Sequence, residues 1–230
     1  MRMKSALFTV LTIITISGHT LGSSLPAGSY NNGTISDSVD LPEFGDGYMR
    51  LFVKRNRGWG SKELVSMIIE TASEMYQFYP SRDRLQTGDL GARFGGQISG
   101  HGSHQNGLDV DLTYYRNNGV EQKPEVTNGF SELMVKNGKT TANFDILRNW
   151  ELVKTLHRYG KIQRIFVDPV IKSELCKFAK KIGEEAGYEE VLRSMRPYPN
   201  HADHLHVRLY CPEDSSSCIP QEEVPEGSGC

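Results

Sequence analysis

The chain has 230 residues, of which 37% are hydrophobic; this is enough to bury one substantial core, and one domain is the default for this length. It carries 26 lysines and arginines against 28 aspartates and glutamates, a formal net charge of −2. This slightly acidic balance excludes the basic footprint with which nucleic-acid-binding proteins hold phosphates.

Residues 1–22 have the composition of a secretory signal peptide. A basic start, Met-Arg-Met-Lys-Ser, is followed by eleven apolar or threonine residues from Ala6 to Ile16, and then by small and polar residues. The apolar run is too short to span a bilayer, so we expect export without stable membrane insertion. An N-terminal core helix is the alternative interpretation. Cleavage near Gly22 would remove two basic residues and no acidic one, leaving a charge of about −4.

The sequence of residues 23–78 predicts an irregular N-terminal segment, a strand and a helix. Residues 23–40 are rich in Ser, Gly and Asn and are expected to be a loose N-terminal lead-in. Residues 48–53 are expected to form a strand. Ser61 is a suitable N-cap for a helix that runs to about residue 78. The apolar side chains of that helix keep the three-to-four spacing of a buried stripe: Leu64, Val65, Ile68, Ile69, Ala72, Met75 and Tyr76.

Residues 108–114 alternate between apolar and polar side chains, which is the period-two pattern of a half-buried strand with one polar face. Asp109 and Asp111 lie on that polar face. After the strand, residues 117–141 form a long polar insertion that begins with the turn sequence Asn-Asn-Gly.

The last part of the chain predicts two helices and two strands. The first helix is stopped by Gly160. Its apolar residues recur at helical spacing: Phe144, Leu147, Trp150, Val153 and Leu156. Residues 161–167 are expected to form a strand, 171–183 a helix, and 204–210 an alternating strand with two histidines and an arginine on one face. We therefore expect an α+β fold, a single domain with a central antiparallel β-sheet flanked by helices.

Five of the seven histidines lie in two short motifs almost a hundred residues apart. His-Gly-Ser-His occupies 101–104, and His-Ala-Asp-His-Leu-His occupies 201–206. A catalytic zinc site needs three nitrogen or oxygen ligands and one open position. If the two alternating strands are neighbours, their polar faces bring Asp111 and His206 together, and the turn at Asn106-Gly107 swings His104 back over the same face. His104, Asp111 and His206 are therefore the predicted ligands of one Zn²⁺ ion.

The remaining histidines of the two motifs are candidates for proton transfer. His204 is the predicted general base, because it lies two residues before His206 on the same strand face. His201 is the second choice, either sharing the proton transfer or stabilising the developing oxyanion. His101 could act in the same way, or it could lie behind the ligands or on the surface.

Two acidic residues and one arginine complete the candidate site. Asp109 is expected to orient a ligand or a histidine by a hydrogen bond, and Asp203 to do the same for His201. Arg208 shares the face of the second motif. It is predicted either to hold a substrate carboxylate or to form a structural salt bridge.

All four cysteines lie in the last quarter of the chain, and an even number in an exported protein indicates disulfides. Cys211 and Cys218 bracket a flexible Pro-Glu-Asp-Ser-Ser-Ser loop that a bridge can close. That pairing leaves Cys176 with Cys230. A zinc–thiolate cluster is the alternative, although the sequence contains no Cys-x-x-Cys.

Both histidine motifs resemble the signatures of a known family. Residues 103–111, Ser-His-Gln-Asn-Gly-Leu-Asp-Val-Asp, and 201–208, His-Ala-Asp-His-Leu-His-Val-Arg, look like those of penicillin-insensitive murein endopeptidases. These are zinc peptidases related to the lysostaphin-type and D-Ala-D-Ala carboxypeptidase folds. Further segments fall in a similar order: residues 41–48, 55–60, 88–90, 165–167 and 196–197. The resemblance predicts a zinc peptidase domain at 41–230.

The resemblance implies a zinc-dependent endopeptidase that hydrolyses the D-alanyl–meso-diaminopimelyl crosslinks of peptidoglycan in the periplasm. It also favours the same disulfide pairing. A zinc D-Ala-D-Ala carboxypeptidase, a peptidoglycan amidase of different bond preference, and a non-catalytic metal binder are the alternatives. The residues alone predict zinc-dependent amide hydrolysis outside the cytoplasm. The sequence contains no Ser-x-x-Lys, which agrees with an enzyme that β-lactams do not acylate.

Overall fold

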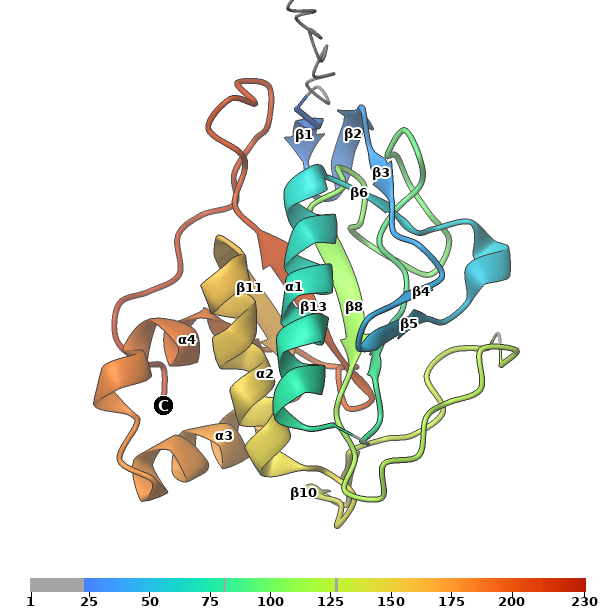
Figure 1. Ribbon diagram of the computed structural model, residues 1–230. Helices are drawn as coiled ribbons and strands as arrows, with labels where there is room; N and C mark the ends of the chain where they lie inside the picture. Colours follow the sequence, from blue (N-terminus) through green and yellow to red (C-terminus); the bar gives the residue numbers. More distant parts are fainter. Residues whose placement is uncertain (1–22, 81, 127) are drawn as a thin grey trace, which may run out of the picture.

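The computed structural model describes residues 23–230 apart from positions 81 and 127 (Figure 1). The predicted signal peptide at 1–22 lies outside the described residues. The helices are α1 Lys62–Phe78, α2 Ile146–Tyr159, α3 Pro169–Lys181 and α4 Glu189–Ser194, with short 3-10 helices η1 Val53–Arg55 and η2 Ala186–Tyr188. The strands are β1 Leu25–Ser29, β2 Asn32–Ser36, β3 Val39–Asp40, β4 Phe44–Gly45, β5 Tyr48–Arg50, β6 Trp59–Gly60, β7 Leu85–Thr87, β8 Asp109–Thr113, β9 Val135–Lys136, β10 Lys139–Thr140, β11 Ile162–Val167, β12 Met195–Pro197 and β13 His204–Leu209.

A seven-stranded sheet organises the domain, with the strand order β12-β11-β13-β8-β7-β5-β4. Its centre, from β11 to β7, is antiparallel, whereas the β11–β12 and β5–β7 pairs are parallel. The two strands that carry the histidine motifs, β8 and β13, are neighbours. The expected α+β single domain with a central sheet flanked by helices is confirmed.

Helices cover one face of this sheet. α1 and α2 run side by side across β8, β11 and β13 (Figure 1). The apolar residues of the two motif strands point to this side and join the helices in one buried core: Val110, Leu112, Leu205, Val207, Leu64, Ile68, Trp150 and Leu156. Because side chains alternate across a strand, the polar residues of β8 and β13 point to the opposite face.

The helix boundaries follow from local signals in the sequence. The Ser61 side chain accepts a hydrogen bond from the Leu64 N–H at 3.1 Å, as expected for the N-cap of α1. Gly160 follows the last residue of α2. α3 begins two residues earlier than predicted, because Asp168 caps it and Pro169 occupies its first turn.

The N-terminal segment differs from the prediction. Residues 23–40 are not a loose lead-in, because β1 and β2 form an antiparallel hairpin and β3 pairs with β6. The reason lies far along the chain: Gly28 exchanges two backbone hydrogen bonds with Ser217 and Ile219, both at 2.9 Å. The C-terminal loop thereby holds the hairpin in place.

The strand β8 also differs from the prediction, because all five of its residues are buried. It was expected to expose its polar face. The loop that carries His101 and His104 covers this face, and the His104 N–H donates to the Asp109 Oδ2 at 2.9 Å.

Two disulfides close the C-terminal region. Cys176 in α3 is bonded to Cys230, and Cys211 is bonded to Cys218. Both predicted pairs are therefore confirmed, and the C-terminus lies beside α3 and α4 (Figure 1). Among the described residues, no helix has both the length and the apolar character needed to cross a membrane.

Candidate metal centre

The register of β8 and β13 sets the two histidine motifs against each other. Asp111 lies opposite His206, and Asp109 lies opposite Arg208. All four side chains point away from the helices, because they share the polar face of the sheet. The sheet itself, rather than a mobile loop, therefore fixes half of the cluster.

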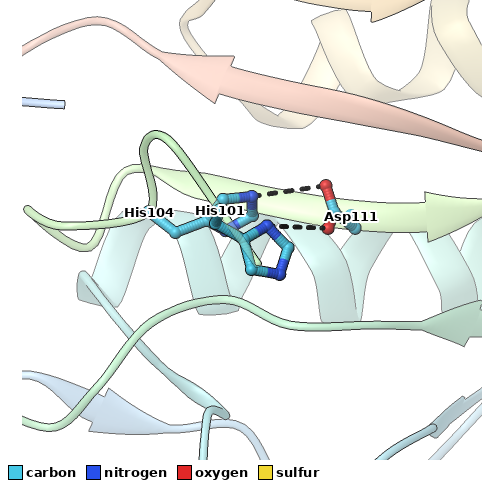
Figure 2. A group of neighbouring side chains, drawn as sticks. All are labelled: His101, His104 and Asp111. Carbon is cyan, nitrogen blue, oxygen red and sulfur yellow. Dashed lines mark ion pairs between the residues drawn. The ribbon is translucent and has the colours of Figure 1, made fainter. Parts of the chain in front are cut away.

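The carboxylate of Asp111 is the centre of the cluster. Its Oδ1 lies 3.3 Å from the His104 Nε2, 3.3 Å from the His206 Nδ1 and 3.7 Å from the His204 Nε2. The His101 Nδ1 lies 3.7 Å from the other oxygen, Oδ2. Figure 2 shows His101 and His104, from one loop, both turned toward this carboxylate. Histidines from both motifs thus meet at one aspartate.

His104 is held by its backbone and by its outer ring nitrogen. Its φ of 67° lies in the left-handed region, which turns the side chain back over β8. The His104 Nδ1 is 2.6 Å from the carbonyl oxygen of Leu90. A carbonyl can only accept a hydrogen bond, so Nδ1 carries the proton and Nε2 presents its lone pair to Asp111.

Asp109 holds His206 from behind, as expected for an orienting carboxylate. Its Oδ1 accepts from the His206 Nε2 at 3.0 Å and from the Arg208 Nε at 2.7 Å. Burial opposes the charge of Asp109, but Arg208 and His206 outweigh it and hold the pKa of this carboxyl well below its usual range. Arg208 thus forms the structural salt bridge, and the His206 Nδ1 is left to face Asp111.

Two buried atoms of the cluster lack a hydrogen-bond partner, the His104 Nε2 and the Asp111 Oδ1. An unpaired buried polar atom costs about 1–3 kcal/mol, so their convergence needs a reason. A tetrahedral zinc ion bound at about 2.0–2.1 Å separates its ligand atoms by about 3.3 Å. His104 and His206 each lie at 3.3 Å from the Asp111 Oδ1. Both separations match that spacing, and imidazole nitrogen and carboxylate oxygen are ligand types of zinc, so these side chains could hold a metal ion.

A second group overlaps with this one. Ligand atoms of His101, His104 and Asp111 all lie within 4.8 Å of one another (Figure 2). The other side of the His101 ring is committed to Asp89, whose Oδ2 lies 3.0 Å from Nε2. The two groups differ in their third residue. The His206 Nδ1 lies 3.3 Å from an Asp111 oxygen, whereas the His101 Nδ1 lies 3.7 Å from one.

His204 and His201 flank the cluster on the other side. The His204 Nδ1 donates to the Asp203 Oδ1 at 2.6 Å, which leaves Nε2 to face Asp111. The ring of His201 lies 4.8 Å from that of His204, and its Nδ1 donates to the Pro199 carbonyl at 2.8 Å. The expectation that Asp203 orients His201 is therefore wrong: the Pro199 carbonyl takes that role, and Asp203 orients His204.

These surroundings shift the pKa values of His204 and His201 in opposite directions. Burial lowers the pKa of His204, but the carboxylates of Asp111 and Asp203 outweigh it and raise the pKa above its usual value. Burial lowers the pKa of His201, and the neighbouring His204 adds to this effect against the hydrogen bond to Pro199. Two titratable groups pushed in opposite directions are typical of an acid–base site.

A cleft of about 1050 Å³ opens over the cluster. It exposes the side of the cluster that the sheet and the buried partners do not cover, so a substrate and a water molecule can reach it. Segments that are distant in sequence form its walls: residues 29–31, 99–104, 128–130, 198–201 and 219–221.

Two residues of this site were not predicted as functional. Asp89 is buried, and its Oδ2 accepts from Arg55 at 2.9 Å, Arg57 at 3.1 Å and His101 at 3.0 Å. Phe130 lies in the insertion and its ring stacks on that of His204 in the second motif. Asp89 lies in a loop without periodic pattern, and its segment, residues 88–90, was noted only for its resemblance to the family, without a role. Phe130 is a single aromatic residue in a polar segment and carried no local signal.

Comparisons with known proteins agree with the motifs. A family model described as "Penicillin-insensitive murein endopeptidase" matches residues 26–230. Relatives with that name include a protein of Haemophilus influenzae, 32% identical over 213 residues, which cover 91% of this chain and 71% of the relative. A relative from Pectobacterium atrosepticum is 35% identical over 218 residues, covering 91% and 73% of the two chains. The range matched by the family model spans both histidine motifs and all four cysteines.

Proposed function

The chain belongs to the penicillin-insensitive murein endopeptidase family, and we propose that it is a zinc-dependent endopeptidase that hydrolyses the D-alanyl–meso-diaminopimelyl crosslinks of peptidoglycan. Family membership by itself gives a peptidase that acts on murein. One observation supports the metal dependence: beneath an open cleft, the unpartnered Asp111 Oδ1 lies 3.3 Å from the unpartnered His104 Nε2 and 3.3 Å from the His206 Nδ1.

We propose His104, Asp111 and His206 as the metal ligands. Each histidine offers one nitrogen inward while its other nitrogen is taken by a fixed partner, Leu90 or Asp109. This is the usual arrangement around histidine ligands, because the outer hydrogen bond fixes the tautomer and the ring orientation. His101 is the competing third ligand, and it is the residue against which this set must be tested.

A zinc ion held there would activate water for attack and polarise the scissile carbonyl. The chain's own residues then have to move the protons. His204 is the proposed general base, because Asp203 holds its Nδ1 as a donor and its Nε2 lone pair faces the cluster. His201, with its lowered pKa, is proposed to share the proton transfer or to stabilise the oxyanion.

The surroundings of His101 favour a supporting role. Asp89 fixes its outer nitrogen, and the inner nitrogen lies at the edge of the cluster, 3.7 Å from the Asp111 Oδ2. We propose that His101 contacts the substrate or the attacking water from the side opposite to His204.

We propose that the enzyme acts on peptidoglycan in the periplasm and is exported there by way of the signal peptide. Two disulfides support this location, because such bonds persist in oxidising compartments. The cleft also suits the substrate, since a crosslink between two stem peptides needs an open groove rather than a closed pocket.

The bond that is cut can be identified directly. Purified crosslinked muropeptide dimers are incubated with the mature protein, and the products are resolved by mass. The proposal predicts conversion of dimers into two monomers without loss of a terminal D-alanine. Release of single D-alanine residues would instead identify a carboxypeptidase, and separation of stem peptide from glycan would identify an amidase. Intact dimers would favour a non-catalytic binder.

A further inference from the structure

Aromatic and imidazole rings form a continuous row across the floor of the cleft. Phe130, from the insertion at 117–141, stacks on His204 with ring centroids 4.7 Å apart and an angle of 23° between the ring planes. On its far side Phe130 contacts Phe52, with centroids 5.4 Å apart. His204 in turn lies beside His201 at 4.8 Å. The ring of the proposed general base thus contacts a phenyl ring and a second imidazole.

The contact depends on a niche in the central sheet region. A Cβ atom on Gly88 would lie 2.6 Å from the Phe130 Cζ and 3.3 Å from the Asp111 Cβ, so an alanine at this position would displace the ring. Gly88 donates its N–H to the Asp111 carbonyl at 2.8 Å, which fixes the niche beside the metal-binding strand. The end of the Phe130 ring is therefore seated against the backbone rather than lying loosely over the surface.

Hydrogen bonds of two buried glutamines hold the insertion in the position that brings Phe130 to His204. Gln86 and Gln122 are both buried and exchange two hydrogen bonds at 2.8 Å, from the Gln86 Nε2 to the Gln122 carbonyl and from the Gln122 N–H to the Gln86 Oε1. The Gln122 side chain then donates to the Gly129 carbonyl at 3.0 Å and accepts from the Ser131 N–H at 2.7 Å. The residues on either side of Phe130 are thus tied through one glutamine to β7.

These contacts constrain His204 in two different directions. The hydrogen bond from its Nδ1 to Asp203 acts in the plane of the ring and sets which nitrogen faces Asp111. It does not prevent the ring from tilting out of that plane. Stacking on Phe130 acts across the ring face and opposes that tilt.

We propose that Phe130 is a positioning residue, which fixes the plane of the His204 imidazole over the metal centre and thereby sets the rate of the proton transfer. This inference rests on the proposed function of the site. It assigns a catalytic purpose to the insertion: the buried glutamine pair holds the segment so that one ring reaches the base.

The test compares two substitutions that remove the stack in different ways. Phe130→Leu removes the ring and keeps an apolar side chain, whereas Gly88→Ala keeps Phe130 and fills its niche. Both should lower kcat by about 10- to 100-fold, the loss expected when a catalytic group is misplaced by about 1 Å, with KM changed less than about threefold. Bound zinc should stay at the wild-type level. Val126→Ala, in the same insertion but outside the cleft, is the matched control and should leave kcat unchanged.

A second measurement reads the position of His204 without any activity. In the NMR spectrum of the zinc-loaded protein, the carbon-bound ring protons of His204 that lie over the Phe130 face are shifted upfield by its ring current. Both Phe130→Leu and Gly88→Ala should move these signals downfield, and Val126→Ala should not.

Three results would overturn the inference. Unchanged His204 signals in both variants would mean that Phe130 does not set the ring position. A kcat within twofold of wild type, with zinc retained, would mean that the position does not matter for turnover. A change in KM alone, or loss of zinc, would make Phe130 a substrate contact or a support for the ligands. If the wild-type protein itself fails to cut crosslinked muropeptides, the proposed function fails, and the NMR comparison still decides whether Phe130 holds His204.

Discussion

At the scale of single residues, each histidine near Asp111 is defined by what its other ring nitrogen contacts. The Leu90 carbonyl fixes His104, and Asp109 fixes His206. Asp89 fixes His101 in the same way. These outer contacts decide the lone-pair directions, so they decide which residues can act as ligands. His206 and His101 compete as the third ligand, so substituting these two residues is the most informative test of the ligand set.

We expect replacement of His104, Asp111 or His206 by alanine to lower bound zinc to well under one ion per chain, because each removes one of three ligand atoms. His101→Ala is the matched control and should keep its zinc. Metal analysis of the purified variants measures this. Full zinc content in the His206→Ala protein, together with its loss from His101→Ala, would exchange the two residues in the assignment.

His204→Ala should separate proton transfer from metal binding. We expect the variant to retain zinc and to lose about 10²–10⁴-fold in turnover, the usual contribution of a general base. The measurement is the rate of muropeptide cleavage at neutral pH beside the zinc content of the same sample. A near-normal rate would remove His204 from this role, and loss of zinc would make it a ligand instead.

At the scale of elements, the strands and helices with a clear period could be predicted and those held by distant contacts could not. β8, β13, α1 and α2 carry alternating or helical patterns, and each was found close to its expected place. The β1–β2 hairpin has no such pattern, because its stability comes from Gly28 pairing with the C-terminal loop. Two of the proposed ligands, Asp111 and His206, could be inferred from strand faces, and His104 only from the Asn106-Gly107 turn that follows it. The Phe130–His204 contact could not, since no local pattern links an insertion to a strand so far along the chain.

A buried histidine between α2 and α4 is expected to make the stability of the fold depend on pH. His157 in α2 donates from its Nε2 to the Ser194 Oγ at 2.7 Å, because the Ser194 hydroxyl is itself donated to the Val191 carbonyl. Burial lowers the pKa of His157 to about 4, against a small opposing effect of Glu190. The folded state therefore disfavours the protonated imidazole.

The sign of the resulting pH dependence follows from proton counting. Between about pH 6.5 and pH 4 the unfolded chain binds a proton at His157 and the folded chain does not, so stability falls as the pH is lowered through this range. From pH 7 to pH 5 the loss should reach at most about 2 kcal/mol. Urea unfolding at both pH values measures it, and His157→Asn should remove this part of the difference. An identical pH dependence in the variant would contradict the assignment.

At the scale of the whole molecule, the C-terminal region fastens elements that are far apart in sequence. The Cys176–Cys230 bridge ties the chain end to α3 across 54 residues, and Cys211–Cys218 closes a loop of 7 residues just after β13. The same loop holds the β1–β2 hairpin, whose turn forms one wall of the cleft. The C-terminal region therefore contributes both to the stability of the fold and to the shape of the cleft.

Removing the longer bridge should cost more stability than removing the shorter one. By the loop-entropy relation, the double replacement of Cys176 and Cys230 by serine should lower the free energy of unfolding by about 4 kcal/mol, and that of Cys211 and Cys218 by about 2 kcal/mol. Denaturant unfolding of both double variants against the wild type measures this. Equal losses, or a larger loss from the short loop, would show that native contacts of the Cys211–Cys218 loop outweigh the chain-entropy effect.

The most direct test of the central claim is a zinc titration of activity. The mature protein is stripped of metal with a chelator, and cleavage of crosslinked muropeptide dimers is measured as zinc is added back in known amounts. If His104, Asp111 and His206 hold one catalytic ion, the stripped protein is inactive and its activity rises in proportion to zinc until about one ion per chain is bound. Undiminished cleavage by the metal-free protein, or activity that does not follow the bound zinc, would contradict the account.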